Sequence, residues 1–412
     1  MPSRMTPFDP EAEALRDDPY PILAEYRRSE PVHWGLPGVP GVPGAWYVFG
    51  HHDCETLLGD ARLGKEIYHR IPPERFAQLP PVYRAYVEQI KNGIVVRDPP
   101  EHTRLRTLLQ GAFTRASIDG LRPSIEAIAE QLLDEMERKG GEADIMVDYA
   151  EALPVYVIAD LIGVPRADRR RLKEWSATIT RSVSGSVKDL SVYGNSTAAS
   201  LAFGEYIGAL AEQRRLEPRD DLLSALLAVE ADGDKLTMPE LISQCRTLLI
   251  GGHETTTNLI GSGFDLLQRH RAQLAELGDD EAAWNTATTE ILRFESPVQF
   301  TFRLAYAPLE VGGRRIAAGD RVMLMLGSAN RDETVFSEPD RFKVRGSGGK
   351  PIHFGRGRHY CIGANLAQLE AYVALSKLFG RFPRITPRVA RFPWRDNLQF
   401  RGFASAPVSL AA

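Results

Sequence analysis

The chain has 412 residues, of which 43% are hydrophobic and 25% are charged. These proportions are typical of a soluble globular protein and exclude a disordered, collagen-like or coiled-coil chain. With 50 basic and 54 acidic residues, the net charge is −4. No strong field therefore favours nucleic acid or an anionic membrane as a partner.

Neither a membrane anchor nor a set of disulfides is predicted. No apolar run reaches the ~18 residues that a transmembrane helix needs. The charged, Pro-rich start, MPSRMTPFDPEAEALRDDPYP, lacks the apolar segment of a secretory signal. Cys54, Cys245 and Cys361 are an odd number of cysteines that lie far apart in the sequence, which does not fit a disulfide framework. We therefore expect a reduced, cytoplasmic protein.

One mainly helical domain with small sheets is expected over residues 1–412. The segments PVHW and AWYVFG flank the repetitive stretch Pro37–Gly44 and predict a hairpin with an extended loop. Further short strands are expected at Leu309–Val311 and Arg321–Leu326. No alternating βαβ pattern with a glycine fingerprint occurs, which argues against a Rossmann or P-loop enzyme. Apolar residues recur at helical spacing in Ile125–Lys139, Asp221–Val229, Thr237–Gln268, Asp280–Phe294 and Ile362–Phe379.

The segment Thr237–Gln268 predicts an unusually long helix, whose first residue and Glu240 have the spacing of a capping box. A helix of this length spans ~45 Å, enough to cross a domain. Its centre reads LLIGGHETTTN, and each glycine in a helix interior costs up to about 1 kcal/mol relative to alanine. Gly251–Gly252 therefore indicates a kink or close helix packing, or else a widened turn beside a ligand at which Glu254 and Thr255 are aimed.

The strongest chemical signal is the segment FGRGRHYCIG at residues 354–363. Its first two glycines allow a tight loop with unusual backbone angles, and a helix is predicted from about Cys361. A sulfur at a helix N-terminus, with Arg356, Arg358 and His359 nearby, is stabilised as a thiolate. We therefore expect Cys361 to be a metal ligand or a nucleophile, and the other two cysteines to be buried and inert.

The residues alone leave the chemistry of this cysteine open. Zinc needs three or four ligands at close spacing, and only His359 and Cys361 lie near each other in this segment. A cysteine nucleophile needs a base and an oxyanion site. His359 is a candidate base, but a hydrolase explains neither the long helix nor the paired basic residues of other segments.

FGRGRHYCIG resembles the haem-binding loop of bacterial cytochromes P450, whose pattern is F-G-x-G-x-H-x-C-x-G, and every fixed position matches. GGHETT, which starts at Gly251, resembles the oxygen-activating motif of that family, A/G-G-x-D/E-T-T. DPPEHTRLR at 98–106, ANRDETVFSEPDRF at 329–342 and the opening FDP…DPYP also resemble segments of bacterial members. The resemblance covers nearly the whole chain, in the right order.

Glu290 and Arg293 resemble the E-x-x-R motif of the family. The spacing alone is uninformative, because it recurs at Glu13–Arg16, Glu25–Arg28, Glu101–Arg104, Glu135–Arg138, Glu212–Arg215 and Glu338–Arg341. Those other pairs are expected to be solvated and worth a few tenths of a kcal/mol. The position of Glu290, between the long helix and the cysteine loop, singles it out. The resemblance implies that Glu290, Arg293 and Arg331 brace the region of that loop without touching substrate.

The resemblance implies a single triangular, mainly helical domain that holds haem b between the long helix and the cysteine loop. Cys361 would be the axial thiolate ligand of the iron, which favours O–O cleavage. His102, Arg106, Arg303 and His359 would balance the two haem propionates, whose charge is costly inside a protein without cations. The remaining residues expected against the haem are Phe354, Gly355 and Gly251.

The resemblance also assigns the catalytic pair. Glu254 and Thr255 would deliver protons to dioxygen as it is reduced. Gly251 stands where alanine is common in the family and leaves more room over the iron. The retained acid and alcohol argue against the peroxide-driven branch of the family, which lacks them.

The walls of the substrate pocket are expected by position in the family. The residues concerned are Val95, Val96, Thr247, Ile250, Gln299, Phe300 and Phe400. The polar stretch Ser182–Tyr193 predicts a loop in the region of the family's mobile lid. A mixture of apolar and polar walls fits a medium or large metabolite such as a biosynthetic intermediate, a terpenoid, a macrolide or a cyclic peptide.

The implied activity is that of a haem-thiolate monooxygenase, which inserts one atom of O₂ into a small organic metabolite by hydroxylation or epoxidation. Electrons would come from NAD(P)H through a separate ferredoxin or flavodoxin, with Arg356 and Arg358 as candidate docking charges, and the enzyme is expected to be a monomer. The alternative on the same haem is oxidative coupling or ring formation. A haem sensor or electron carrier is the alternative outside catalysis, and the pair Glu254–Thr255 argues against it.

Overall fold

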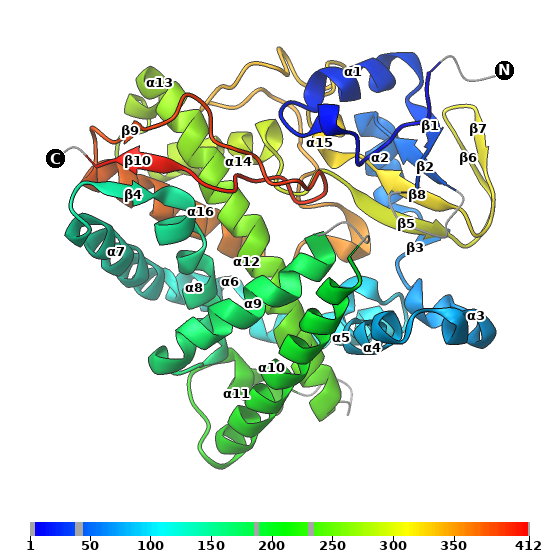
Figure 1. The fold of residues 1–412 in the computed structure, drawn as a ribbon, viewed down its shortest axis with the longest axis horizontal. Helices are drawn as coiled ribbons and strands as arrows, with labels where there is room; N and C mark the ends of the chain where they lie inside the picture. The colour runs from blue at the N-terminus through cyan, green and yellow to red at the C-terminus, as the bar shows by residue number, and fades with distance from the viewer. Residues whose placement is uncertain (1–4, 38–43, 185–188, 230–234, 411–412) are drawn as a thin grey trace. The chain divides into compact units, whose positions relative to one another are not determined.

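The structure, a computed structural model, describes residues 5–37, 44–184, 189–229 and 235–410 (Figure 1). The chain forms two compact units. The first unit comprises Met1–Gly64, Ala129–Ala150 and Thr255–Ala412, and the second comprises Lys65–Ile128 and Glu151–Glu254. Helices α7 (Arg122–Arg138) and α12 (Met238–Arg269) contribute residues to both units. The single domain expected over residues 1–412 stays a prediction.

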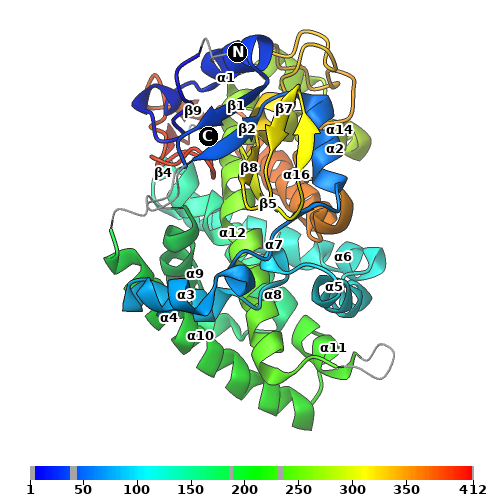
Figure 2. The ribbon, with the colours of Figure 1, turned by 90° about the vertical axis from the view of Figure 1, so that its right-hand side faces the viewer.

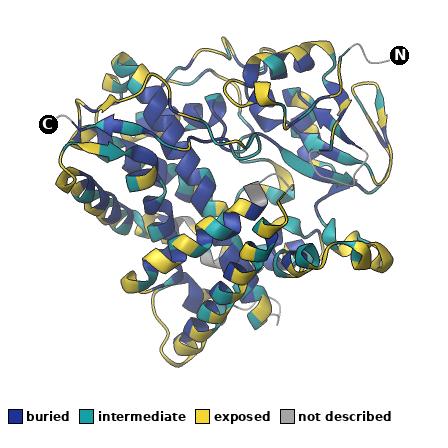
Figure 3. Ribbon diagram, viewed as in Figure 1, coloured by how far each residue is buried: buried dark blue, intermediate teal, exposed yellow. Residues whose placement is uncertain are grey.

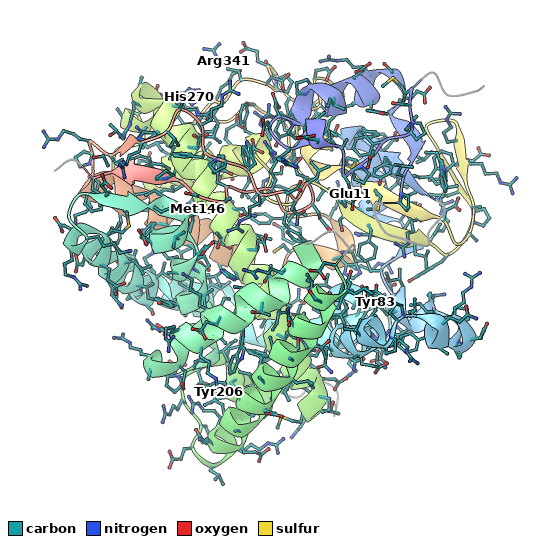
Figure 4. The ribbon with its side chains drawn as sticks, in the orientation of Figure 1. Glu11, Tyr83, Met146, Tyr206, His270 and Arg341 are labelled. Carbon is teal, nitrogen blue, oxygen red and sulfur yellow. The ribbon has the colours of Figure 1, made fainter. Side chains whose placement is uncertain are left out.

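The regular elements described in the second unit are all helical. Besides its parts of α7 and α12, its elements are η2 (Tyr68–Arg70), α3 (Pro73–Gln78), α4 (Pro81–Ile90), η3 (Ile94–Val96), α5 (Glu101–Ala112), α6 (Arg115–Gly120), α8 (Ala152–Ile162), η5 (Arg166–Asp168), α9 (Arg169–Ser184), α10 (Ser191–Leu216) and α11 (Leu222–Ala228). Helix α10 packs against α9 and α4. Tyr83 (Figure 4) and Tyr86 of α4 meet Tyr193 of α10, with each pair of ring centroids 4.9 Å apart, so an aromatic cluster joins these two helices.

The first unit contains the sheets. The largest has the strand order β1-β2-β8-β5-β3, made of β1 (Val32–Gly35), β2 (Ala45–Val48), β8 (Arg321–Leu324), β5 (Thr301–Ala305) and β3 (Leu63–Gly64). Its β1 and β2 pair antiparallel with Trp34 opposite Trp46, which confirms the predicted hairpin, and Figure 2 shows β1, β2 and β8 side by side. The loop between β1 and β2 lies outside the described residues over 38–43.

Two smaller sheets complete the β structure described in the first unit. Strands β6 (Leu309–Val311) and β7 (Arg314–Ile316) form a hairpin, and β4 (Glu142–Asp144), β10 (Pro407–Ser409) and β9 (Thr386–Pro387) form a three-stranded sheet. The predicted strand Leu309–Val311 is confirmed with the same bounds, and the predicted strand Arg321–Leu326 ends two residues earlier, at Leu324.

The first unit also contains helices. They are η1 (Glu13–Leu15), α1 (Tyr20–Ser29), α2 (His51–Gly59), the π-helical segment η4 (Ile145–Ala150), α13 (Arg271–Ala275), α14 (Glu281–Phe294), α15 (Leu326–Ala329), η6 (Gly357–His359) and α16 (Ala364–Arg381). Helix α14 packs against α16, and α2 packs against η6 of the cysteine loop. All of the long helices predicted from apolar spacing are present, and their ends differ from the predictions by three residues at most.

Helix α12 is the long helix that the sequence predicts, and most of its residues are buried (Figure 3). It begins with the expected capping box, in which the N–H of Thr237 donates to Glu240 Oε2 at 2.9 Å and the N–H of Glu240 donates to Thr237 Oγ1 at 3.4 Å. At Gly261 the helix passes so close to Met146 (Figure 4) that a Cβ would collide with its sulfur.

Within the described residues, no helix combines the length and the apolarity that crossing a bilayer requires.

Candidate functional site

The cysteine loop of the first unit joins η6 to α16. Gly355 and Gly357 both have positive φ, +72° and +69°, a conformation that glycine adopts without strain. The N–H of Cys361 donates to the carbonyl of Phe354 at 3.0 Å, which closes the loop. Helix α16 begins at Ala364, so Cys361 precedes the helix by three residues and the predicted helix start at Cys361 is wrong.

The loop lies directly against the end of α2. A Cβ added at Gly357 would come within 3.2 Å of the carbonyl oxygen of Leu58, so this position needs glycine for close approach as well as for its φ. Arg356 forms an ion pair with Glu55 of α2. The carboxyl of Asp60, at the end of α2, has a lowered pKa, chiefly because Arg62 donates to it, and the charge of Arg358 contributes to the same shift.

The three cysteines differ in environment. Cys54 and Cys245 are fully buried, and Cys361 is half-buried. Burial raises the pKa of the Cys54 thiol well above its usual range and that of Cys245 to about 12. Both thiols therefore stay protonated at neutral pH, as the prediction of inert cysteines requires.

The ion pair of Glu290 and Arg293 is buried in the first unit. The Glu290 and Arg293 side chains are 2% and 1% exposed, and the Nε and Nη2 atoms of Arg293 donate to the two carboxylate oxygens at 2.7 and 2.8 Å. Arg293 also donates to the carbonyls of Asn330 and Pro339, at 2.9 and 3.0 Å. The hydroxyl of Ser347 donates to Glu290 at 2.7 Å. The pair therefore ties α14 to the chain that leads to the cysteine loop.

Arg331 braces the same end of α14 by other contacts than expected. It makes no bond to Glu290 or Arg293 in the described part of the chain, but donates twice to the carbonyl of Phe294, at 2.9 and 2.6 Å. By contrast with the buried pair, Glu212–Arg215 and Glu338–Arg341 are ion pairs whose side chains are more than half exposed. The prediction that such repeats of the spacing are solvated is confirmed for these two.

The middle of α12 carries the GGHETT motif. The helix is α-helical from Met238 to Arg269, so the widened turn considered at Gly251–Gly252 is wrong. A Cβ at Gly252 would come within 2.9 Å of Ile158 of α8, which confirms close helix packing at this glycine. Gly251 is different, because it is exposed and a Cβ there would meet no atom within 4 Å. Glu254 is buried and Thr255 is half-buried.

The basic residues expected to face the propionates lie in both units. His102 and Arg106 are one turn apart on α5 of the second unit, with His102 buried and Arg106 half-buried. In the first unit, Arg303 is buried on β5 and donates to the carbonyl of Phe302 at 2.9 Å, and His359 is half-buried at the end of η6.

The residues expected around the substrate fall into two groups. Val95 in η3 is 48% exposed, and the others of the first group, Val96, Thr247, Ile250 and Phe400, are half-buried. Gln299 and Phe300 belong to the interior of the first unit. Gln299 donates to Tyr20 and to the carbonyl of Ser296, and Phe300 packs in an aromatic core cluster. Both side chains are buried in the first unit, and the contact of Gln299 and Phe300 with a substrate stays a prediction.

Gln244 holds one part of the expected pocket wall in place, and sequence reasoning missed it. Its amide accepts from the N–H of Ile94 and donates to the carbonyl of Asn92, both at 3.1 Å. The contact fixes the chain immediately before Val95 and Val96. The available signal was a pair of polar residues, Gln244 and Arg246, inside the apolar stretch of α12.

The loop predicted over Ser182–Tyr193 is shorter than we expected, because both ends of this stretch are helical and only residues 189–190 are described outside a helix. Residues 182–184 are the end of α9 and residues 191–193 are the start of α10, while 185–188 lie outside the described residues. Ser182 is buried and bonds to Ser196 of α10 at 2.9 Å, so this polar residue pairs between two helices and does not mark a loop.

The donor set fits a haem held by a thiolate. Cys361 offers a half-buried sulfur in a loop fixed by two positive-φ glycines. Gly251 leaves open space on the face of an otherwise buried helix. The basic side chains of His102 and Arg303 are almost wholly buried, as expected of groups that balance carboxylates inside a protein.

Comparison with known proteins agrees with this chemistry. The family profile "Cytochrome P450" matches residues 285–409. Over almost the full length, the chain is 36% identical to the polyketide biosynthesis cytochrome P450 PksS of Bacillus subtilis (strain 168), with 98% of each protein covered. It is also 36% identical to the 6-deoxyerythronolide B hydroxylase of Saccharopolyspora erythraea, again with 98% of each covered.

Solved structures show the same fold. The structure of PksS superposes with a TM-score of 0.88 at 36% identity, covering 98% of this chain and 100% of that chain. P450BioI in complex with hexadec-9Z-enoic acid ligated acyl carrier protein gives 0.87 at 32% identity, with 97% and 100% covered. A myxobacterial cytochrome P450 in complex with myristic acid gives 0.87 at 36% identity, with 97% and 98% covered. The chain therefore belongs to the cytochrome P450 family, whose members bind haem through a cysteine thiolate, and is a haem-thiolate monooxygenase.

Proposed function

We propose that Cys361 is the axial thiolate of this monooxygenase. The observation that carries the assignment is its position, half-buried in the glycine-bent loop before α16, while Cys54 and Cys245 are fully buried with raised thiol pKa values. When bound, the thiolate-ligated haem supplies the activation of dioxygen and the transfer of one oxygen atom to an organic substrate. Phe354 closes the loop through its carbonyl, and Gly355 gives the bend.

When haem is bound, its propionates would be held by basic side chains from two helical elements and one strand. His102 and Arg106 lie one turn apart on α5, so both present their side chains to one ligand. His359 lies two residues from Cys361, and Arg303 is on β5. Arginine binds carboxylates in a bidentate fashion and keeps its charge when buried, which suits this task.

Glu254 and Thr255 move protons to the oxygen that is reduced. Thr255 holds a water molecule with its hydroxyl, and Glu254 passes protons inward from solvent. Gly251, one turn earlier, has no Cβ and leaves the helix face beside them open. These are adjacent residues on one rigid helix, so their separation and order are fixed by α12 itself.

The substrate is a small or medium organic metabolite that is hydroxylated or epoxidised. The relatives include a cytochrome P450 of polyketide biosynthesis and a 6-deoxyerythronolide B hydroxylase, and one solved relative holds myristic acid. Val95 and Val96 of η3, Thr247 and Ile250 of α12 and Phe400 supply the wall in this proposal. Gln299 and Phe300, which are buried in the first unit, complete the wall in this proposal.

Electrons reach the haem from a separate redox partner, and we propose a ferredoxin or flavodoxin fed by NAD(P)H in the cytoplasm. The enzyme acts as a monomeric single domain over residues 1–412. Arg356 and Arg358 are the docking charges, although Arg356 already pairs with Glu55. Replacing both by glutamine flattens the salt dependence of ferredoxin binding; an unchanged affinity and salt slope would reject this docking site.

Optical titration of the ferric protein against fatty acids, macrolide precursors, terpenoids and cyclic peptides tests the substrate class. A substrate that displaces water from the iron shifts the Soret band. A saturable shift with one class identifies the substrate, and turnover with a surrogate ferredoxin then yields a product carrying one added oxygen. Turnover that couples or cyclises the substrate without adding oxygen would contradict the proposed hydroxylation or epoxidation.

A further inference from the structure

Arg246 of α12 is a buried cation with an unusual partner. Its side chain is 5% exposed, and its hydrogen bonds go to two oxygens of one residue, the backbone carbonyl of Gln89 and, at 3.4 Å, the side-chain amide of Gln89. Burial lowers the pKa of Arg246 to about 10, so the guanidinium stays charged at neutral pH. Within the described part of the chain, no carboxylate pairs with it.

Six other buried arginines among the described residues pair with a carboxylate. These pairs are Arg27–Glu333, Arg169–Asp160, Arg214–Asp221, Arg293–Glu290, Arg331–Asp340 and Arg401–Glu295. A buried charge is costly unless it is paired. The C-terminal end of α4, to which Gln89 belongs, offers only about half of a negative charge. Arg246 therefore keeps an excess of positive charge inside the second unit.

Two residues with hydroxyl groups, Tyr86 and Ser243, lie near this charge in the second unit. Tyr86 lies close enough for the charge of Arg246 to act on its phenol, and Tyr86 shares a hydrogen bond with Ser182. Ser182 in turn bonds to Ser196 at 2.9 Å. Ser243 lies one helical turn before Arg246, and its buried hydroxyl has no hydrogen-bond partner among the described residues. A guanidinium with several hydroxyls is a donor set for an anion.

The residues next to Arg246 favour a ligand that is apolar and long beyond its anionic end. Tyr86 and Val87 belong to an apolar cluster with Tyr193. A ligand whose anionic end binds Arg246 would therefore lay its remaining atoms against apolar and aromatic side chains. Arg246 precedes Thr255 by nine residues on one helix, which is a rise of ~13 Å. A ligand that spans this length has a charged head group far from the position that is oxidised.

We propose that Arg246, with the hydroxyls of Tyr86 and Ser243, binds the carboxylate of the substrate, so that the enzyme oxidises a long-chain organic acid in its free form. This inference rests on the proposed function of the same site and narrows its substrate class. Recognition through the head group orients the chain along α12 and presents carbons remote from the carboxylate to the haem.

The test compares dodecanoic acid with dodecanol and methyl dodecanoate, which share the chain and lack the charge. Binding to the haem-loaded protein is measured by calorimetry, which does not depend on a spectral shift, and in parallel by the Soret band. The variants are Arg246→Gln, Arg246→Lys and, as the matched control, Arg170→Gln, which removes an exposed arginine of the same unit.

We expect the wild type and the Arg170→Gln variant to bind the acid about 10- to 100-fold more tightly than the alcohol. Arg246→Gln loses that preference and keeps its affinity for the alcohol, and Arg246→Lys retains part of the preference. Equal loss of affinity for acid and alcohol in Arg246→Gln would show a purely structural arginine. If Arg246→Gln does not fold, the preference for acid over alcohol in the wild type and in Arg246→Lys still tests the proposal.

Wild-type protein that binds the methyl ester as tightly as the acid, or binds no member of the series, overturns the proposal. The first of these results would point to an esterified or thioester-bound substrate. Failure of the proposed function is a separate outcome. In that case the reduced carbonyl complex lacks the red-shifted Soret band of thiolate ligation, whether or not the protein prefers the acid.

Discussion

Thr255 and its neighbours on α12 have different roles, because some pack against other helices and others belong to the proposed catalytic site. Gly251 leaves the helix face open, Gly252 allows α8 to approach, and His253 bonds through Nδ1 to Ser176 of α9 at 2.7 Å. Within five positions the helix therefore alternates between packing against neighbouring helices and the proposed chemistry. This periodicity is that of an α-helix, in which adjacent residues point 100° apart.

Thr255→Ala separates oxygen consumption from product formation. Without its hydroxyl, the water that passes protons is no longer held, so reduction continues while oxygen transfer fails. We expect the yield of product per NAD(P)H consumed to fall at least ~10-fold, measured by product assay beside oxygen uptake. Thr256→Ala, the adjacent buried threonine on α12, serves as the control. An unchanged yield in Thr255→Ala would refute the assigned role.

Glu370 of α16 makes stability depend on pH. It is buried, and its Oε2 has no hydrogen-bond partner in the part of the chain that the structure describes. Burial raises the pKa of its carboxyl well above the usual range. As the pH rises above about 4.3, the unfolded chain releases this proton while the folded protein holds it. Stability therefore falls with rising pH until the raised folded-state pKa is passed, by at most about 1.4 kcal/mol per pH unit.

Glu370→Gln removes that dependence. The variant should gain stability relative to wild type as the pH is raised from 5 to 9, with little difference at the acidic end, as measured by urea unfolding at constant haem content. Glu205→Gln, at an exposed site on α10, provides the matched comparison. Parallel stability curves for wild type and Glu370→Gln would mean that this carboxyl does not stay protonated in the fold.

At the scale of elements, α12 positions a neighbouring segment through its side chains. Gln244 bonds to both sides of Gly93, at Asn92 and Ile94, and Thr247 lies so near Gly93 that a Cβ there would come within 2.7 Å of its hydroxyl. The proposed wall residues of η3 therefore depend on the register between η3 and α12, although the two elements lie far apart in the sequence.

Gln244→Leu releases this segment. The N–H of Ile94 and the carbonyl of Asn92 lose their partners, at a cost of roughly 1–3 kcal/mol for each buried group. We expect faster hydrogen exchange at Ile94 and a product mixture with poorer regioselectivity. Gln213→Leu, an exposed glutamine of α10 in the same unit, should change neither. Unaltered exchange at Ile94 in Gln244→Leu would contradict the positioning role.

The buried pair of α14 has a different consequence, which is stability of the loop region. In Glu290→Gln the guanidinium of Arg293, 1% exposed, keeps its charge and loses its counter-charge. Breaking a buried pair in this way costs about 3–5 kcal/mol, so a lower melting temperature and weaker haem retention are expected. Glu212→Gln breaks an exposed pair of the same spacing and should cost at most ~1 kcal/mol. Similar losses of stability in Glu290→Gln and Glu212→Gln would contradict a special role for the buried pair.

The sequence predicted the helices and strands better than it predicted which side chains pack inside the protein. The long helix, its capping box and the β1–β2 hairpin were predictable because they depend on local spacing and turn chemistry. The interior places of Gln299 and Phe300 were not, because they depend on Tyr20 and on the aromatic cluster around Phe8, nearly 300 positions away. The start of α10 at Ser191 was missed for the same reason, since its polar residues pair with those of α9.

At the scale of the whole molecule, the recognised motifs are distributed over both units. The cysteine loop, Thr255 and the bracing pair belong to the first unit, and Glu254, His102 and the proposed acid-binding residues belong to the second. Sequence order alone identified the motifs because each is short and local. It could not show Arg246, whose significance lies in the absence of a carboxylate among described residues that the fold brings near it.

The most direct test of the central claim is the spectrum of the reduced carbonyl complex in wild type and in cysteine variants. The assignment of Cys361 as the haem ligand predicts a strongly red-shifted Soret band in wild type, Cys54→Ser and Cys245→Ala, and loss of that band in Cys361→Ser alone. A wild-type spectrum without the shifted band, or a Cys361→Ser variant that retains it, would contradict the account.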